Sequence, residues 1–194
     1  MQIPNWPFGA MKPNSYGMIM ADPPWRFATR SEKGRGRSAE QHYDTMTLDE
    51  IKALPVRDLV RKEGAFLWLW GTAPMDQMTH EVMEAWGFHY VTQGVWVKTT
   101  KAGKPNMGTG YVLRNSHEPY LIGRMGKAKA MSRSVRSAIL SPRREHSRKP
   151  EQAYADAQLL SGDVPRADLF SRQSRPGWDS WGNEAQRFDL PLAA

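Results

Sequence analysis

The chain has 194 residues, enough for one α/β domain with a hydrophobic core, and we expect residues 1–194 to form that single domain. Its 27 Lys and Arg against 20 Asp and Glu give a formal net charge of +7, which favours an anionic partner, with nucleic acid first. The lack of cysteine excludes disulfides, thiolate zinc sites and a Cys nucleophile, and neither a membrane-spanning apolar run nor a signal-peptide pattern is present, so we expect no membrane partner.

The N-terminal part predicts a strand, a loop and a short helix. Residues 16–21 are apolar, as in a buried strand. Residues 28–40 are small, polar and basic, which predicts a mobile loop that either contacts substrate or is a plain surface loop. Thr47 and Glu50 have the spacing of a capping box and predict the start of a short helix.

A second strand and helix are predicted next. Residues 64–70 are continuously apolar, which indicates a strand buried on both faces. Thr72 is expected to cap the following helix, whose apolar positions over 75–86 have helical spacing and which Gly87 ends.

The C-terminal half continues the alternation. We expect a helix with Pro150 in its first turn that ends before Gly162, and strands at residues 94–97, 119–122 and 167–170. Strands and helices that alternate with short links predict a three-layer α/β fold with a mainly parallel sheet.

Positive charge is concentrated in residues 98–149. This region has 13 Lys and Arg against two acids, a net charge of +11, so the remainder of the chain is net −4. Such a region predicts a nucleic-acid-recognition surface that faces phosphates, although any one of these side chains is better explained as a solvated charge than as a specific contact. The candidate phosphate contacts are Arg124, Lys127, Lys129, Arg133, Arg136, Arg143 and Arg144.

The most informative motif is Asp22-Pro23-Pro24-Trp25, directly after the first predicted strand. A carboxylate and a fixed backbone carbonyl at this corner would accept hydrogen bonds from an exocyclic amine, and an aromatic ring would stack on its base. The alternative is a Pro-rich corner with Trp25 packed in the core.

This motif resembles the signature of the S-adenosylmethionine-dependent adenine-N6 methyltransferases that include the catalytic subunit of the messenger-RNA adenosine methyltransferase and short bacterial and phage relatives. The resemblance extends along most of the chain, in one order, through the segments at residues 43–46, 64–70, 96–99, 149–151, 169–172 and 178–184. The catalytic corner precedes the cofactor motifs, which resembles the permuted order called β class.

The resemblance implies a Rossmann-like methyltransferase fold, S-adenosyl-L-methionine as cofactor, and transfer of its methyl group to adenine N6. DNA is favoured as substrate because the short relatives are mostly expected to modify DNA; RNA methylation and a catalytically silent nucleic-acid-binding subunit are the alternatives. We expect a cytoplasmic location, because no signal-peptide pattern is present, in the bacterial or phage-infected cell that the short relatives imply. A homodimer is a further expectation, although Trp68, Trp70 and Trp96 fit the core as well.

Roles for individual residues are expected as well. The resemblance implies that the catalytic residues are the four of the corner motif and that the cofactor-binding residues are Asp22, Pro23, Lys149, Arg172, Asn183 and Glu184. The expected substrate-binding residues are Trp25, Tyr43 and Lys98, together with Arg124 and Lys127 from the basic region.

Two features depart from common patterns. No Gly-x-Gly loop follows the last predicted strand, and Ser174 and Arg175 stand in a region where the messenger-RNA enzyme has a His-Asn pair, so adenosine contacts are expected to differ there. The histidines have no metal-ligand spacing, so we expect no metal; His117 and Glu118 are expected to be a polar pair, with a structural hydrogen bond favoured over a substrate contact.

Overall fold

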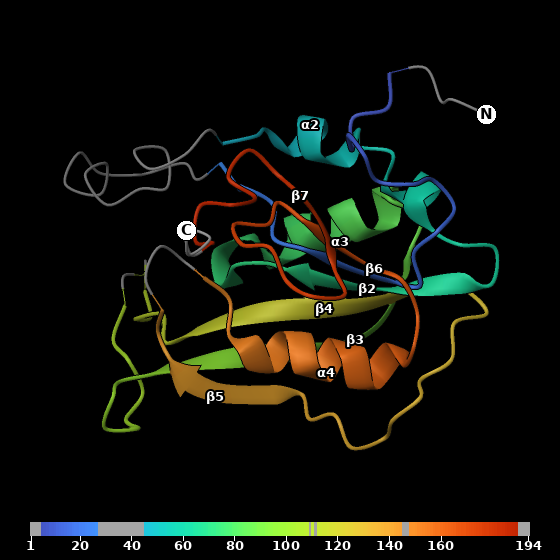
Figure 1. Ribbon diagram of the computed structural model, residues 1–194. Coiled ribbons are helices and arrows are strands. Elements are labelled where there is room, and N and C mark those ends of the chain that lie inside the picture. Colours follow the sequence, from blue (N-terminus) through green and yellow to red (C-terminus); the bar gives the residue numbers. More distant parts are fainter. Residues whose placement is uncertain (1–4, 27–44, 109, 111, 145–147, 190–194) are drawn as a thin grey trace, which may run out of the picture.

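The computed structural model describes residues 5–26, 45–108, 110, 112–144 and 148–189. The predicted loop at residues 28–40 and the candidate substrate residue Tyr43 lie outside the described residues. The described residues form a seven-stranded sheet in the order β5-β3-β4-β2-β1-β6-β7 (Figure 1). The strands are β1 (Met18–Ala21), β2 (Gly64–Trp70), β3 (His89–Thr99), β4 (His117–Gly126), β5 (Ala138–Pro142), β6 (Arg166–Leu169) and β7 (Asp179–Trp181).

The predicted fold class, an α/β Rossmann-like fold with a mainly parallel sheet, is confirmed. Among the described strands, β1 pairs in parallel with β2 and β6, and the pairs β3–β5 and β6–β7 are also parallel. Only β4 runs against its neighbours β2 and β3. Residues 100–116 between β3 and β4 contain no described helix, so this connection provides no crossover and the chain returns antiparallel.

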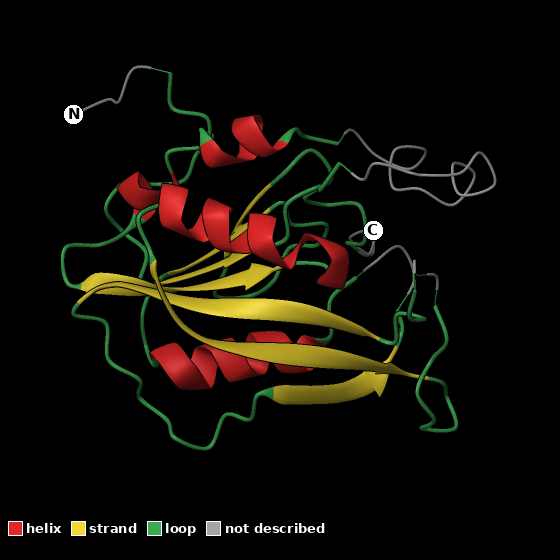
Figure 2. Ribbon diagram, turned by 180° about the vertical axis from the view of Figure 1, so that it is seen from behind, coloured by secondary structure: helices red, strands yellow, loops and turns green. Residues whose placement is uncertain are grey.

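Helices cover both faces of the sheet (Figures 1 and 2). On one side lie α2 (Leu48–Lys52) and α3 (Asp76–Ala85), with the short helices η2 (Val56–Leu59) and η3 (Ala73–Met75); on the other lies α4 (Glu151–Ser161). All seven residues of β2 are buried, and they alternate between two core clusters, with Leu67 in the first and Trp68 in the second. This explains the uninterrupted apolar run in the sequence.

Local sequence signals decide most helix ends. The capping box at α2 is confirmed, because the Thr47 and Glu50 side chains each bond to the other's backbone N–H. Gly87 follows α3 with a φ of 82°, as its predicted stop requires. The prediction that Thr72 caps α3 is wrong: η3 comes between, the N-cap of α3 is Met75, and the Thr72 side chain makes no capping bond.

The tryptophans considered for a dimer surface belong to the core. Trp68, Trp70 and Trp96 are each at most 1% exposed, and Trp68 stacks on Tyr120 with ring centroids 4.2 Å apart. They therefore carry no argument for a homodimer. Within the part of the chain that the structure describes, no helix is long and apolar enough to cross a membrane.

Candidate active site

The corner motif stands at the carboxyl end of β1, next to the carboxyl ends of β2 and β6. Ala21 is paired with Leu69 and Leu169, so Asp22 is the first residue beyond the sheet, and its N–H donates to the Leu169 carbonyl at 3.3 Å. The carboxyl edge of a parallel sheet is where α/β proteins place their ligands. Because β4 is antiparallel, it begins rather than ends at this edge, and it brings Glu118 there.

Lys149 links the corner motif to the start of α4. Its Nζ lies 2.6 Å from Asp22 Oδ2 and 3.2 Å from a Glu118 oxygen, and only 8% of its side chain is exposed. It also lies 5.3 Å from the centroid of the Trp70 ring. Two residues expected to touch the cofactor, Asp22 and Lys149, thus form a direct ion pair although 127 positions separate them in the sequence.

Glu118 is a site residue that the sequence analysis did not assign to the site. Its carboxylate lies between two lysines, with Lys98 Nζ at 2.5 Å and Lys149 Nζ at 3.2 Å. The expected His117–Glu118 pair is therefore replaced, for Glu118, by an ion pair with each lysine. A signal was present, because Glu118 and Glu145 are the only acids in the basic region of residues 98–149.

The ionisation of this buried group is controlled by mutual pairing. Burial alone would lower the pKa of Lys149, yet the Asp22 and Glu118 carboxylates outweigh it and the pKa is raised. Burial alone would raise the pKa of Glu118, but Lys149 and Lys98 hold that pKa below its ordinary value. Lys149 and Glu118 therefore stay charged at neutral pH.

A second polar group closes the other side of the site at the end of β6. Asp168 Oδ2 accepts hydrogen bonds from Tyr154 Oη at 3.1 Å and from Ser171 Oγ at 2.9 Å, and Arg175 Nη1 lies 3.4 Å away. The Arg175 guanidinium also stacks 3.6 Å from the centroid of the Tyr154 ring. Burial raises the pKa of Asp168 to about 6, against the opposing effects of Arg175 and the hydroxyl donors.

The turn after β6 takes the place of a Gly-x-Gly loop. Phe170 has a φ of 61°, a left-handed conformation that a non-glycine residue adopts with strain. A Cβ on Gly182 would lie 3.0 Å from the Phe170 Cα and the Ser171 carbonyl oxygen, so glycine is required there. The backbone of β7 and the turn after it thereby pack directly on the β6 turn, bringing Asn183 and Glu184 to the same edge.

Arg172 and Glu184, both expected to bind cofactor, also meet. Arg172 Nε lies 3.7 Å from Glu184 Oε2, and that oxygen is buried with no hydrogen bond from any described residue. Asn183 lies in the same turn and lines, with Gly182 and Glu184, a second open depression.

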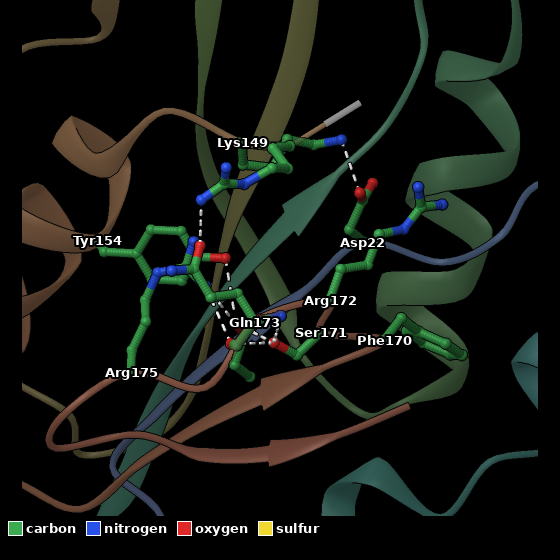
Figure 3. Close-up of a pocket in the computed structure, with 10 residues that line it drawn as sticks. Asp22, Lys149, Tyr154, Phe170, Ser171, Arg172, Gln173 and Arg175 are labelled. Carbon is green, nitrogen blue, oxygen red and sulfur yellow. Dashed lines mark hydrogen bonds and ion pairs between the residues drawn. The ribbon is translucent and has the colours of Figure 1, made fainter. Parts of the chain in front are cut away.

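A cavity lies between these groups and is lined by Asp22, Arg148, Lys149, Tyr154, Asp168, Phe170, Ser171, Arg172, Gln173 and Arg175 (Figure 3). It holds about 330 Å³ of empty space, solvent at its mouth included. The lining combines cations suited to a carboxylate with acids suited to an ammonium group. Next to the lining residue Arg172 lies a buried Glu184 oxygen that accepts no hydrogen bond from a described residue. A zwitterionic cofactor with ribose hydroxyls fits this set of donors and acceptors.

The remaining predicted residues are placed differently. Trp25 is 4% exposed, and its indole N–H donates to the Trp70 carbonyl at 3.3 Å, so the ring lies in the core rather than at an open face. The Pro23 carbonyl accepts a hydrogen bond from the Trp25 N–H at 2.8 Å. Arg124 is paired with Phe66 in the register of β4 and β2, so it and Lys127 lie toward the opposite edge of the sheet from Asp22. Lys98, in contrast, reaches the site through Glu118.

Comparison with known proteins shows the family of the chain. The model of the MT-A70 family matches residues 16–184, so the chain belongs to the MT-A70 family. One relative is the N(6)-adenosine-methyltransferase MT-A70-like protein of Arabidopsis thaliana, 32% identical over 174 residues, which are 88% of this chain and 24% of that protein. Another is the N(6)-adenosine-methyltransferase catalytic subunit METTL3 of Homo sapiens, 28% identical over 180 residues, which are 90% of this chain and 29% of that protein.

A bacterial relative is similar in size. The Type II methyltransferase M.MunI of a Mycoplasma species is 28% identical over 197 residues, covering 91% of this chain and 81% of that protein. The plant relatives are much longer, and the chain spans about a quarter of their length.

Proposed function

We propose that the protein transfers a methyl group from S-adenosylmethionine to N6 of adenine in nucleic acid, and that DNA is its preferred substrate. The observation that carries the proposal is the placement of Asp22, in a proline-fixed corner at the ligand edge of the sheet, within 2.6 Å of Lys149 in the wall of a polar cavity. Membership of the MT-A70 family supports the reaction class.

Asp22 is the acceptor for the adenine amine in this proposal. Lys149 engages its Oδ2, which fixes the orientation of the carboxylate and directs Oδ1 to the ligand. A hydrogen bond from N6–H to that oxygen draws the nitrogen toward tetrahedral geometry and frees its lone pair for attack. The same carboxylate is placed to accept the proton that N6 loses.

Pro23 and the corner backbone supply a second acceptor. The Pro23 carbonyl already accepts the Trp25 N–H, and its other lone pair remains for the amine. Pro23 and Pro24 restrict the backbone before any ligand arrives, so the acceptors need no reorganisation. Trp25 contributes by fixing the corner from within the core, and stacking on the base would require its ring to leave that position.

S-adenosylmethionine, when bound, supplies the electrophilic methyl group. Lys149 and Arg172 are suited to its carboxylate, Asp168 to its ammonium group, and the buried Glu184 oxygen and Asn183 to its ribose hydroxyls. These assignments rest on the chemistry of the side chains, on the cavity that Lys149, Asp168 and Arg172 share, and on the ion pair that joins Arg172 to Glu184 beside it.

DNA is preferred on one ground. The net charge of +7 suits DNA and RNA equally, but the chain matches a short relative, the Type II methyltransferase, over most of its length. The resemblance associates such short relatives with DNA.

A methyl-transfer assay with Asp22→Asn tests the proposed role of Asp22. We expect transfer to fall at least about a hundredfold, because a positioned acceptor is lost, while the circular dichroism spectrum is unchanged. Asp163→Asn, an exposed acid in the turn after α4, is the matched control and should be fully active. Near-normal transfer by Asp22→Asn would overturn the mechanism.

Four matched substrates test the substrate preference: single- and double-stranded DNA and RNA of one sequence, with the methylated position identified in the product. Faster transfer to DNA is expected, and faster transfer to RNA would replace DNA in the proposal. Calorimetry with S-adenosylmethionine tests the remaining alternative, since absence of binding would indicate a catalytically silent subunit.

A further inference from the structure

Two groups of cations stand out in the basic region. The first lies at the catalytic edge and is paired with acids: Lys98 and Lys149 with Glu118, and Arg144 with Glu151. Lys101, Lys104, Arg114 and Arg143 belong to neither group, because they are exposed at that same edge and no described acid lies within ion-pair distance of them. Those beyond the middle of β4 are exposed, and no described acid lies within ion-pair distance of them. This second group is Arg124, Lys127, Lys129, Arg133 and Arg136.

Four of these five cations lie on one connection, residues 127–137, which we call the strap. In Figure 1 the strap leaves the end of β4, passes around the C-terminal end of α4 and reaches β5. Three backbone hydrogen bonds hold it: Lys127 N–H to the Glu63 carbonyl at 2.9 Å, Met131 N–H to the Leu160 carbonyl at 2.9 Å, and Val95 N–H to the Ser137 carbonyl at 2.8 Å. The strap therefore presents its cations from a fixed backbone.

The surroundings of the strap leave its positive charge uncompensated. The sequence between Glu118 and Glu145 has seven Lys and Arg and no Asp or Glu. On α4, Glu151 is occupied by Arg144 and Arg175, and Asp156 is buried. Two exposed acids lie at this end, Asp163 in the turn after α4 and Glu63, which pairs with Arg61, so the four cations of the strap still outnumber them.

The strap is also separated from the catalytic corner by a fixed length. Lys149, just before α4, touches Asp22, whereas Met131 of the strap bonds to Leu160 near the end of that helix. Eleven residues of helix span about 16 Å at 1.5 Å per residue. At about 3.4 Å per base-pair step this equals roughly five base pairs of duplex.

From these observations we propose that the strap is a second nucleic-acid contact, which binds the phosphate backbone about five base pairs from the adenine that enters the site. The inference rests on the proposed function for the identity of the polyanion. Exposed cations on a fixed backbone, with no described acid within ion-pair distance, suit sequence-independent phosphate contacts, because such contacts need charge at intervals and no base edges. The strap then positions the duplex while the corner acts on the base.

Direct binding tests the inference without any methyl transfer. The variant Lys129→Gln/Arg133→Gln removes two strap charges, and Lys12→Gln/Arg57→Gln removes two exposed charges on the α2 side as the matched control. Fluorescence anisotropy measures the Kd of a labelled 24-base-pair duplex (a length of about two helical turns) at several salt concentrations. All four positions are exposed, so both variants are expected to fold.

For the strap variant we expect the slope of log K against log salt to shrink by about 1.8, at about 0.9 for each phosphate contact, with a Kd raised about tenfold or more at low salt. The control should retain the wild-type slope. Equal slopes for the strap variant and the wild type would overturn the inference. So would a polyglutamate peptide that competes for the strap as strongly as an unlabelled duplex, since that result would indicate an acidic protein partner.

The two proposals fail separately. Duplex binding that is unchanged by the strap substitutions, in a protein that still methylates adenine, would refute the strap alone. Strap-dependent binding of duplex by a protein that transfers no methyl group would refute the proposed reaction and leave the strap as a nucleic-acid contact.

Discussion

Glu118→Gln tests whether the buried charge group holds the site together. The substitution keeps the shape of the side chain but removes the negative charge that separates Lys98 and Lys149. Lys149, 8% exposed, is then left with Asp22 as its charged partner, and Lys98 loses its own. We expect the folded state to be destabilised.

The size of the destabilisation can be worked out from the distances between Glu118 and the two lysines. With an effective dielectric constant of about 20, unit charges at 3.2 Å and 2.5 Å attract by about 5 and about 7 kcal/mol. Most of this gross energy is offset, because the neutral amide of the variant does not require a buried carboxylate to be desolvated. Breaking one side of a buried ion pair costs about 3–5 kcal/mol, and the remaining Asp22–Lys149 contact favours the lower end, about 3 kcal/mol.

Urea denaturation followed by circular dichroism measures this difference. A loss of about 3 kcal/mol corresponds to a Tm about 6–12 °C lower for a chain of this size. Glu84→Gln, an exposed acid near the end of α3, is the control and should change the free energy of unfolding by less than about 0.5 kcal/mol. The pH dependence should agree: because the folded-state pKa of Glu118 is lowered, its contribution is present above about pH 4.5 and is lost as the pH falls below it. A Glu118→Gln protein as stable as the wild type would refute the reasoning.

Two further predictions concern stability. The pKa of Asp168 is raised to about 6 from an ordinary 3.8, so the free energy of unfolding of the wild type should fall by up to about 3 kcal/mol as the pH rises from about 4 to about 6. Denaturation of the Asp168→Asn variant across that pH range should lack this slope. An unchanged slope would contradict the assignment. Gly94→Ala would place a Cβ 2.2 Å from the Tyr120 ring, which is already stacked on Trp68, so we expect a loss of about 1–3 kcal/mol in urea denaturation, whereas Thr92→Ala at a neighbouring exposed position should be nearly neutral.

Local patterns in the sequence predicted helix ends and strands correctly where the signal and the structure that it specifies lie within a few residues. The Thr47–Glu50 box and the apolar run of β2 behave as predicted, since capping and burial on two faces depend on neighbouring positions. The prediction for Thr72 failed because a turn of 3-10 helix comes first and leaves its hydroxyl without the N–H it was expected to accept. β5 and β7 were not predicted, because short edge strands form only where a longer neighbour offers them a ladder.

For the candidate site too, the sequence identified some features and only the fold decided others. The corner motif, Lys149, Arg172 and Glu184 were selected by residue type and order, and the structure brings Asp22 to Lys149 and Arg172 to Glu184. The burial of Trp25 was among the alternatives, but only the packing of β2 against the corner decided for it.

The sequence by itself determined the class of fold, the family and the residue types of the corner, because these depend on composition and on short ordered motifs. Only the tertiary structure decided that β4 runs antiparallel, that Glu118 therefore joins Lys98 and Lys149 at the carboxyl edge of the parallel strands, and that Arg124 and Lys127 lie toward the other edge. The physical reason is that charge pairing requires separations of a few ångströms between residues far apart in the chain. Strand direction and register fix those separations, and no local pattern encodes them.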